Sequence, residues 1–96
     1  MQINMTGHRM ELTPALKQFT QEKFDKLEKH FDKITSINIV FDVEKVRQIA
    51  EATILVTQGE LHARSETDDM YASVDDLVNK LDRQLLKHKE KLREKR

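Results

Sequence analysis

The amino-acid sequence predicts a two-layer α+β domain with the element order β-α-β-β-β-α. Two segments, residues 14–33 and the stretch from residue 70 onwards, repeat apolar residues with the 3.6-residue period of a helix. The segments around and between them alternate apolar and polar residues, as half-buried strands do. Two helices can then cover the apolar face of a four-stranded sheet around one core. The 96 residues form a single domain without repeat or linker, and residues 93–96 are expected to fray.

The chain opens with a short strand and a helix. Residues 2–6 alternate apolar and polar side chains, which indicates a strand. Thr13 can cap the unpaired N–H groups of a helix, and Pro14 suits the first helical position because no partner is needed for its missing N–H. The helix should end at Phe31 or Lys33. Its buried stripe consists of Leu16, Phe24, Leu27 and Phe31.

Three further strands follow as an antiparallel meander. Residues 36–44 and 49–57 alternate, and Gln58-Gly59 supplies a tight turn into a third strand. Short connections between consecutive strands imply antiparallel pairing. The side chains expected to point inward are Ile37, Ile39, Phe41 and Val43, then Ala50, Ala52, Ile54 and Val56, then Leu61, Ala63 and Ser65.

The last helix carries an apolar face and a separate cationic face. Asp68 or Asp69 can cap its N-terminus, and it should run from about Met70 to near the end of the chain. Its apolar face consists of Val74, Leu77, Val78, Leu81, Leu85 and Leu92. Cationic side chains recur at i, i+3, i+7 and i+11, which places them on one side of the helix. We call Lys80, Arg83, Lys87 and Lys91 the C-terminal stripe, with Gln84 on the same side.

The first helix also separates its charges. Lys23, Lys29 and Lys33 lie within about 60° of Lys26 around the helix axis, and most of the acidic residues lie elsewhere. The pattern is compatible with an ordinary solvated helix that has i,i+4 ion pairs such as Glu22–Lys26 and Asp25–Lys29. If both helices pack on one side of the sheet, the two basic rows can instead form a single surface. This N-terminal row consists of Lys23, Lys26, Lys29 and Lys33.

The formal net charge is zero, but the charge is distributed in blocks. Residues 1–39 hold 6 Lys and Arg against 5 Asp and Glu, residues 40–76 hold 3 against 9, and residues 77–96 hold 8 against 3. A basic stripe on a neutral protein suggests an extended polyanion as partner, with phosphates as the first candidate. An alternative is that basic residues at the end of the helix only complement the helix dipole. That effect is confined to the last turn, so it would not explain Lys80 and Arg83, which lie nearer the middle of the helix.

The sequence offers little for catalysis or metal binding. It has no cysteine, its histidines lack metal-ligand spacing, and its serines lack an identifiable base. We therefore expect no enzyme, cofactor or metal. His62 should be solvated or salt-bridged. Tyr71 should pack in the core beside Met70, with contact to a polyanionic partner as its alternative. No signal peptide and no apolar run of about 20 residues occurs, so we expect a cytoplasmic protein that does not enter membranes.

Seven segments, which together span essentially the whole chain, resemble one known family. They are QIN at 2–4 with GH at 7–8, LTPAL at 12–16, KFDKLE at 23–28, VEKV at 43–46, GELHA at 59–63, DMYA at 69–72 and KLDRQLLKHK at 80–89. In these segments the sequence resembles the short bacterial ribosome hibernation promoting factors, which belong with the ribosome-associated inhibitor and sigma-54 modulation proteins.

The resemblance implies a fold similar to double-stranded-RNA-binding domains. It also implies binding to the small ribosomal subunit near the decoding centre, where the factor would block mRNA and tRNA and inhibit translation. In stationary phase it would promote inactive dimers of 70S ribosomes together with a ribosome modulation factor, and the unbound protein would be a monomer. The basic residues of both helices would face ribosomal RNA.

A second hypothesis remains open from the residues alone. The acidic segment 40–76 could hold a basic protein partner, which would make the chain a protein-interaction module.

Overall fold

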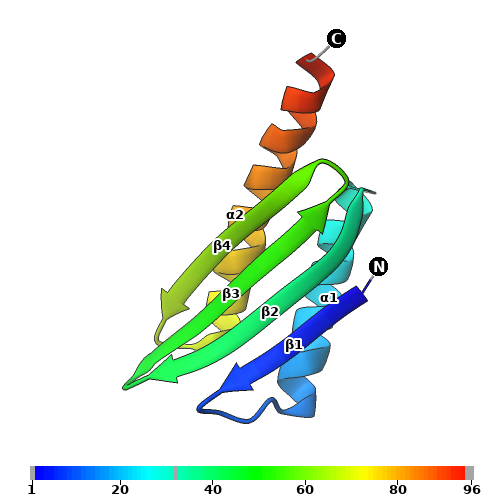
Figure 1. Ribbon diagram of the computed structural model, residues 1–96. Coiled ribbons are helices and arrows are strands. Elements are labelled where there is room, and N and C mark those ends of the chain that lie inside the picture. The colour runs from blue at the N-terminus through cyan, green and yellow to red at the C-terminus, as the bar shows by residue number, and fades with distance from the viewer. Residues whose placement is uncertain (1, 32, 95–96) are drawn as a thin grey trace.

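The computed structural model describes residues 2–31 and 33–94, with side chains up to Lys91. The elements are β1 (Gln2–His8), α1 (Pro14–His30), β2 (Ile34–Glu44), β3 (Arg47–Val56), β4 (Gly59–Thr67) and α2 (Met70–Glu94). The predicted fold class and element order are confirmed (Figure 1). Of the end that was expected to fray, residues 93–94 continue the helix, and residues 95–96 lie outside the described residues.

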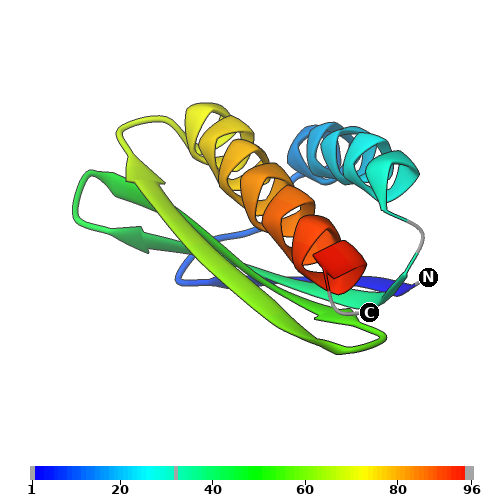
Figure 2. The same cartoon turned by 90° about the horizontal axis from the view of Figure 1, so that it is seen from above.

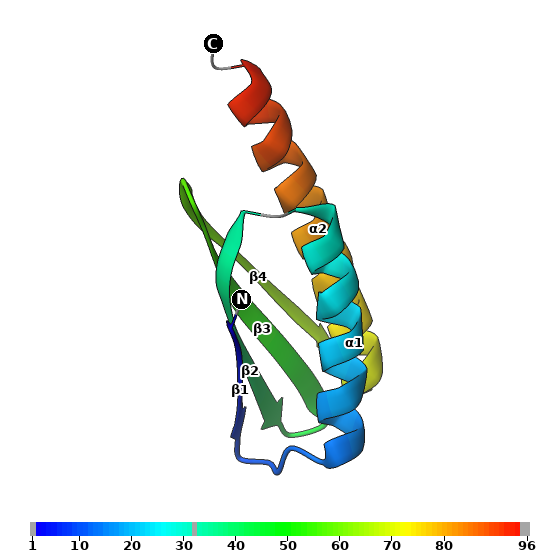
Figure 3. The same ribbon diagram turned by 90° about the vertical axis from the view of Figure 1, so that its right-hand side faces the viewer.

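The four strands form one mixed sheet in the order β1-β2-β3-β4. The β2–β3 and β3–β4 pairs are antiparallel, which confirms the predicted meander. β1 pairs with β2 in parallel because the intervening α1 carries the chain back along the sheet before β2 begins. Both helices lie on the same side of the sheet (Figures 2 and 3).

The core lies between the helices and the inner face of the sheet. Phe41 on β2 and Phe24 on α1 have no exposed surface, and Leu77 and Leu81 of α2 are buried in the same core cluster. Val43 and Leu61 were expected to point inward but are only half-buried. The side chain of Leu92, placed in the apolar face by the sequence, lies outside the described side chains. The remaining predicted inward positions of the strands are buried: Ile37, Ile39, Ala50, Ala52, Ile54, Val56, Ala63 and Ser65.

Local capping sets the helix boundaries. Thr13 Oγ1 accepts a hydrogen bond of 3.1 Å from the Leu16 N–H, as predicted. α1 ends at His30, and Phe31 is its C-cap, so Lys33 lies beyond the helix. Of the two candidate caps for α2, Asp69 is the one used, because its Oδ1 accepts from the Tyr71 N–H at 3.3 Å.

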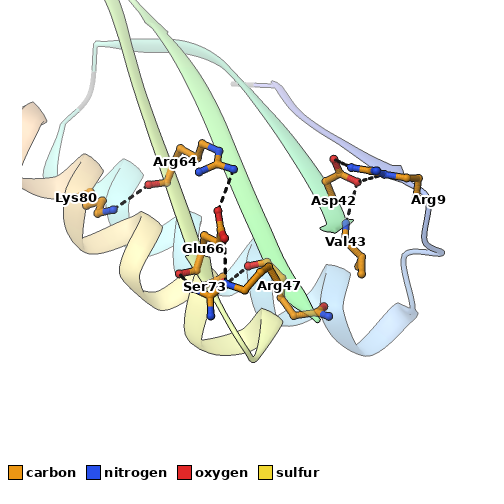
Figure 4. A network of polar contacts seen from close by, with 9 residues as sticks. Arg9, Asp42, Val43, Arg47, Arg64, Glu66, Ser73 and Lys80 are labelled. Atoms are coloured by element: carbon orange, nitrogen blue, oxygen red, sulfur yellow. Dashed lines mark hydrogen bonds and ion pairs between the residues drawn. The ribbon is translucent and has the colours of Figure 1, made fainter. Parts of the chain in front are cut away.

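The end of β1 is fastened to β2 by an ion pair. Arg9 adopts a φ of 59°, a left-handed conformation that is costly for a residue with a side chain. Its guanidinium donates two hydrogen bonds to Asp42, of 2.9 and 2.7 Å (Figure 4). This bidentate geometry holds the chain in place as it leaves β1. The turn also needs Gly7, since a Cβ atom there would lie 2.7 Å from the Met10 carbonyl oxygen.

A second ion-pair cluster covers the outer face of the sheet. Glu66 accepts from Arg47 Nε at 2.9 Å and lies 3.1 Å from Arg64 Nη2 (Figure 4). Between this cluster and the Arg9–Asp42 pair lies Ile49, which pairs with Asp42 on β2 and with Glu66 on β4 and is only 5% exposed. The charged side chains therefore shelter an apolar side chain on the face opposite the helices.

These carboxylates should make the fold sensitive to acid. The hydrogen bond from Arg9 lowers the pKa of Asp42 below its ordinary 3.8, and the hydrogen bond from Arg47 lowers the pKa of Glu66 below 4.5. Their stabilising contribution is therefore present above the unfolded-state pKa values and is lost as the pH falls from about 4.5 through the lower folded-state values. In urea denaturation, an Asp42→Asn/Glu66→Gln variant should lose less stability between pH 6 and pH 3 than the wild type. Equal losses would contradict the assignment.

Candidate nucleic-acid interface

The C-terminal stripe lies along the flank of α2 that faces β4. Arg83, Lys87 and Lys91 are exposed, whereas Lys80 and Gln84 are half-buried. An open groove of about 290 Å³ separates this flank from β4. Within the described residues, no carboxylate lies within ion-pair distance of Arg83 or Lys87. These two cations are thus available to an external anion. The groove is lined by Ala63, Arg64, Lys80, Arg83, Gln84 and Lys87.

Lys80 of the stripe and the neighbouring Gln84 are tied to the sheet rather than directed outward. Lys80 Nζ donates to the Arg64 carbonyl at 2.9 Å, and Gln84 Nε2 donates to the His62 carbonyl at 2.9 Å (Figure 4 shows the first). Because these carbonyls belong to the edge strand β4, the bonds brace α2 against the sheet. The exposed cations of the stripe are consequently carried on a fixed helix.

Asp76 secures this brace. Ser65 Oγ donates to Asp76 Oδ2 at 2.7 Å, and Lys80 Nζ lies 3.3 Å from the same oxygen. The Ser65 hydrogen bond, followed by the Lys80 hydrogen bond, lowers the pKa of Asp76 below its ordinary 3.8. A carboxylate that stays ionised at neutral pH therefore positions Lys80 within the stripe.

Arg64 extends the interface and was not singled out by the sequence. It lines the groove together with Arg83 and Lys87, and its half-exposed guanidinium is paired with Glu66 at 3.1 Å. The alternation of its strand predicts that Arg64 lies on the outer face. The sequence does not show that this strand forms the sheet edge beside α2, so it could not place Arg64 in the groove.

The N-terminal row lies in a different environment. Lys23 is half-buried, with Nζ 3.0 Å from Asp75 Oδ1 on α2 and 5.3 Å from the centre of the Phe19 ring. Lys26 lines a groove of about 200 Å³ between the two helices. Lys29 is exposed on α1, and Lys33 is exposed in the connection to β2, where its carbonyl accepts from the Thr57 N–H at 3.0 Å.

The expectation of a single surface built from both basic rows is wrong. Lys23 reaches the flank of α2 that faces α1, whereas Lys80 and Gln84 reach the opposite flank, beside β4. The α1-facing flank of α2 carries the acidic residues Asp75 and Asp82. Both helices do pack on one side of the sheet, but helical periodicity could not indicate which neighbour each flank of α2 would meet.

The predicted ion pairs within α1 are also not formed among the described residues. Asp25 instead accepts a hydrogen bond of 2.9 Å from Gln21 Nε2, and neither Glu22–Lys26 nor Asp25–Lys29 reaches ion-pair distance.

Three residues that the sequence left less defined now have partners. His62 Nε2 lies 2.8 Å from Glu51 Oε2 on the outer face of the sheet, which agrees with the second of its two expected environments, a contact with a carboxylate. Tyr71 is 39% exposed and packs edge-on against Phe19 at 4.9 Å, between the helices rather than in the core. The His88 ring packs edge-on against Phe31 at 5.8 Å.

The described residues contain no group of three or more His, Cys, Asp or Glu side chains arranged to hold a metal ion. Over the same part of the chain, no helix has the length and apolar character required to cross a membrane.

Bacterial sequence relatives match this chain along nearly its whole length. A ribosome hibernation promoting factor from Klebsiella oxytoca is 54% identical over 94 residues, which covers 98% of this chain and 99% of that protein. The ribosome hibernation promoting factor of Escherichia coli K12 is 50% identical with the same coverage.

Solved structures agree with these sequence relatives. A ribosomal subunit interface protein from Coxiella burnetii superimposes with a TM-score of 0.90 at 37% identity, covering 94% of this chain and 99% of that one. The N-terminal domain of Thermus thermophilus Protein Y shares the fold, with a TM-score of 0.81 at 24% identity over 88% of this chain and 96% of that one. The model of one family matches residues 3–93. The chain therefore belongs to the sigma 54 modulation protein / S30EA ribosomal protein family.

Proposed function

We propose that this protein is a ribosome hibernation factor that binds ribosomal RNA of the small subunit near the decoding centre. The observation that carries the proposal is the C-terminal stripe, in which Arg83 and Lys87 are exposed and form no ion pair among the described residues, on a helix braced against β4. The names of the full-length relatives, ribosome hibernation promoting factor, support the ribosome as the partner.

The proposed mechanism is occupancy, and it requires no chemical step. Cations on a rigid helix pair with RNA phosphates, and the bound domain excludes mRNA and tRNA from their path. Since each neutralised phosphate releases counterions, about six contacts would make the affinity fall roughly 1,000-fold between about 50 and 200 mM salt. In stationary phase the cytoplasmic, monomeric protein would then favour inactive 70S dimers together with a ribosome modulation factor.

The residues proposed to contact ribosomal RNA come from both basic rows, which lie on opposite flanks of α2, and the larger share is assigned to α2. Among the predicted residues, Arg83, Lys87 and Lys91 contact phosphates directly, and Lys80 and Gln84 position the helix. On α1, Lys26, Lys29 and Lys33 are exposed, whereas Lys23 is engaged by Asp75.

A protein-interaction module that uses residues 40–76 is less well supported. Several carboxylates of this segment are already paired within the molecule: Asp42 with Arg9, Glu51 with His62 and Glu66 with Arg47 and Arg64. A basic partner protein would have to displace these pairs.

A sucrose gradient of stationary-phase lysate tests the proposal. We expect the protein in the fractions of small subunits, 70S ribosomes and ribosome dimers, and its release after nuclease treatment. If it stays at the top of the gradient, or remains bound to a basic protein after nuclease treatment, the proposed function fails.

A further inference from the structure

Two carboxylates on α2 face the basic row of α1. Asp75 Oδ1 lies 3.0 Å from Lys23 Nζ, and Asp82 Oδ1 lies 3.0 Å from His30 Nδ1. The carboxylates are seven residues apart on the same flank of α2, and both line the groove between the helices, as does Lys26. About half of each carboxylate side chain is exposed, so both reach the surface that a ligand would meet.

These contacts change what α1 can offer to a phosphate. Lys23 has Asp75 on one side and the Phe19 ring on the other, so a phosphate must displace Asp75 before it can use this cation. A phosphate near Lys26 also meets Asp75 and Asp82 in the same groove, and their charges repel it. In the stripe, Asp76 pairs with Lys80, but no carboxylate of the described residues lies within ion-pair distance of Arg83 or Lys87.

We propose that Asp75 and Asp82 act as specificity-determining residues that suppress binding to polyanions in general. They hold Lys23 in an ion pair and the His30 ring in a hydrogen bond, so a flexible polyanion gains little from α1. Binding of ribosomal RNA depends less on Lys23 and His30, because the C-terminal stripe positions that RNA. This inference rests on the proposed function for its physiological ligand.

The test compares an Asp75→Asn/Asp82→Asn variant with the wild type on two probes, poly(U) and isolated small ribosomal subunits, over a range of salt concentrations. The affinity for poly(U) should rise roughly three- to tenfold, as expected for the loss of one exposed ion pair and of two negative charges from the groove. The salt dependence for poly(U) should steepen by about 0.7 for each released cation that contacts a phosphate. The gain on small subunits should be smaller.

Two further variants separate position from net charge. Glu11→Gln/Asp68→Asn removes the same charge from two exposed residues that take part in no ion pair of the described chain. Its affinity for poly(U) should rise less than that of the Asp75→Asn/Asp82→Asn variant. Adding Lys23→Gln to Asp75→Asn should cancel the gain of Asp75→Asn, because the released cation is then absent. Thermal melting by circular dichroism confirms that each variant is folded.

The inference is overturned if the poly(U) affinity of the Asp75→Asn/Asp82→Asn variant is unchanged. It is also overturned if the Glu11→Gln/Asp68→Asn variant gains the same affinity for poly(U), or if the affinity of the Asp75→Asn/Asp82→Asn variant for small subunits rises by the same factor. The proposed function fails separately, if the wild type does not bind small subunits. The comparison of poly(U) affinities between the variants can be interpreted whether or not the wild type binds small subunits.

Discussion

Replacing Arg83 and Lys87 with glutamate is expected to abolish co-sedimentation with small ribosomal subunits. Both side chains are exposed on a braced helix, and neither has an ion-pair partner among the described residues. Each substitution removes an attraction and places a like charge against a phosphate, so we expect the affinity to fall more than about 100-fold. Sedimentation of purified components at low salt measures the loss.

The matched control is Lys17→Glu/Lys45→Glu, which changes the net charge equally at two exposed positions outside the stripe. It should retain most of the binding. Equal losses in the two double variants would show that only net charge matters, and retention by Arg83→Glu/Lys87→Glu would contradict the proposed interface. Lys80 is left intact because its bond to the Arg64 carbonyl supports the fold.

The largest effect on stability is expected from Phe41→Ala. Phe41 has no exposed surface and lies in the centre of the sheet, opposite Gly7 on β1 and Ala50 on β3. Truncation removes its buried surface and leaves a cavity, which lowers the free energy of unfolding by about 3–5 kcal/mol. Since small domains have about 5–15 kcal/mol in total, the variant should be partly unfolded at room temperature or close to it.

Urea denaturation followed by circular dichroism measures this difference. Leu55→Ala is the control, because Leu55 lies on the outer face of the sheet and is 39% exposed, so it should cost less than about 1 kcal/mol. A Phe41→Ala midpoint within the range of the control would show that the core tolerates the cavity by collapsing around it.

The features that the sequence predicted well are those encoded within a few residues. The Thr13 cap, the α2 start behind Asp69, and the alternation in β2 and β3 all depend on neighbours close in the chain. The parallel pairing of β1 with β2 could not be predicted in this way, because alternation shows which face of a strand is buried but not which strand lies beside it.

The same limit applies to the candidate interface. Helical spacing predicts the C-terminal stripe correctly as one flank of α2, because that spacing is a property of the helix alone. It does not predict that Lys23 meets Asp75 or that Arg64 lies in the groove beside Arg83, since these contacts depend on how the elements pack. Lys33 was assigned to a helix that ends three residues earlier, at His30.

The hydrogen bonds from Lys80 and Gln84 to β4 also bear on self-association. Edge strands with unpaired carbonyls can recruit strands of other chains, and this leads to aggregation. Here the His62 and Arg64 carbonyls are already occupied by α2, so an incoming strand would have to break both bonds to extend the sheet. At the other edge, β1 carries no Lys, Arg, Asp or Glu between Gln2 and His8. Strand addition is therefore opposed at one edge of the sheet by the helix that carries the cationic stripe.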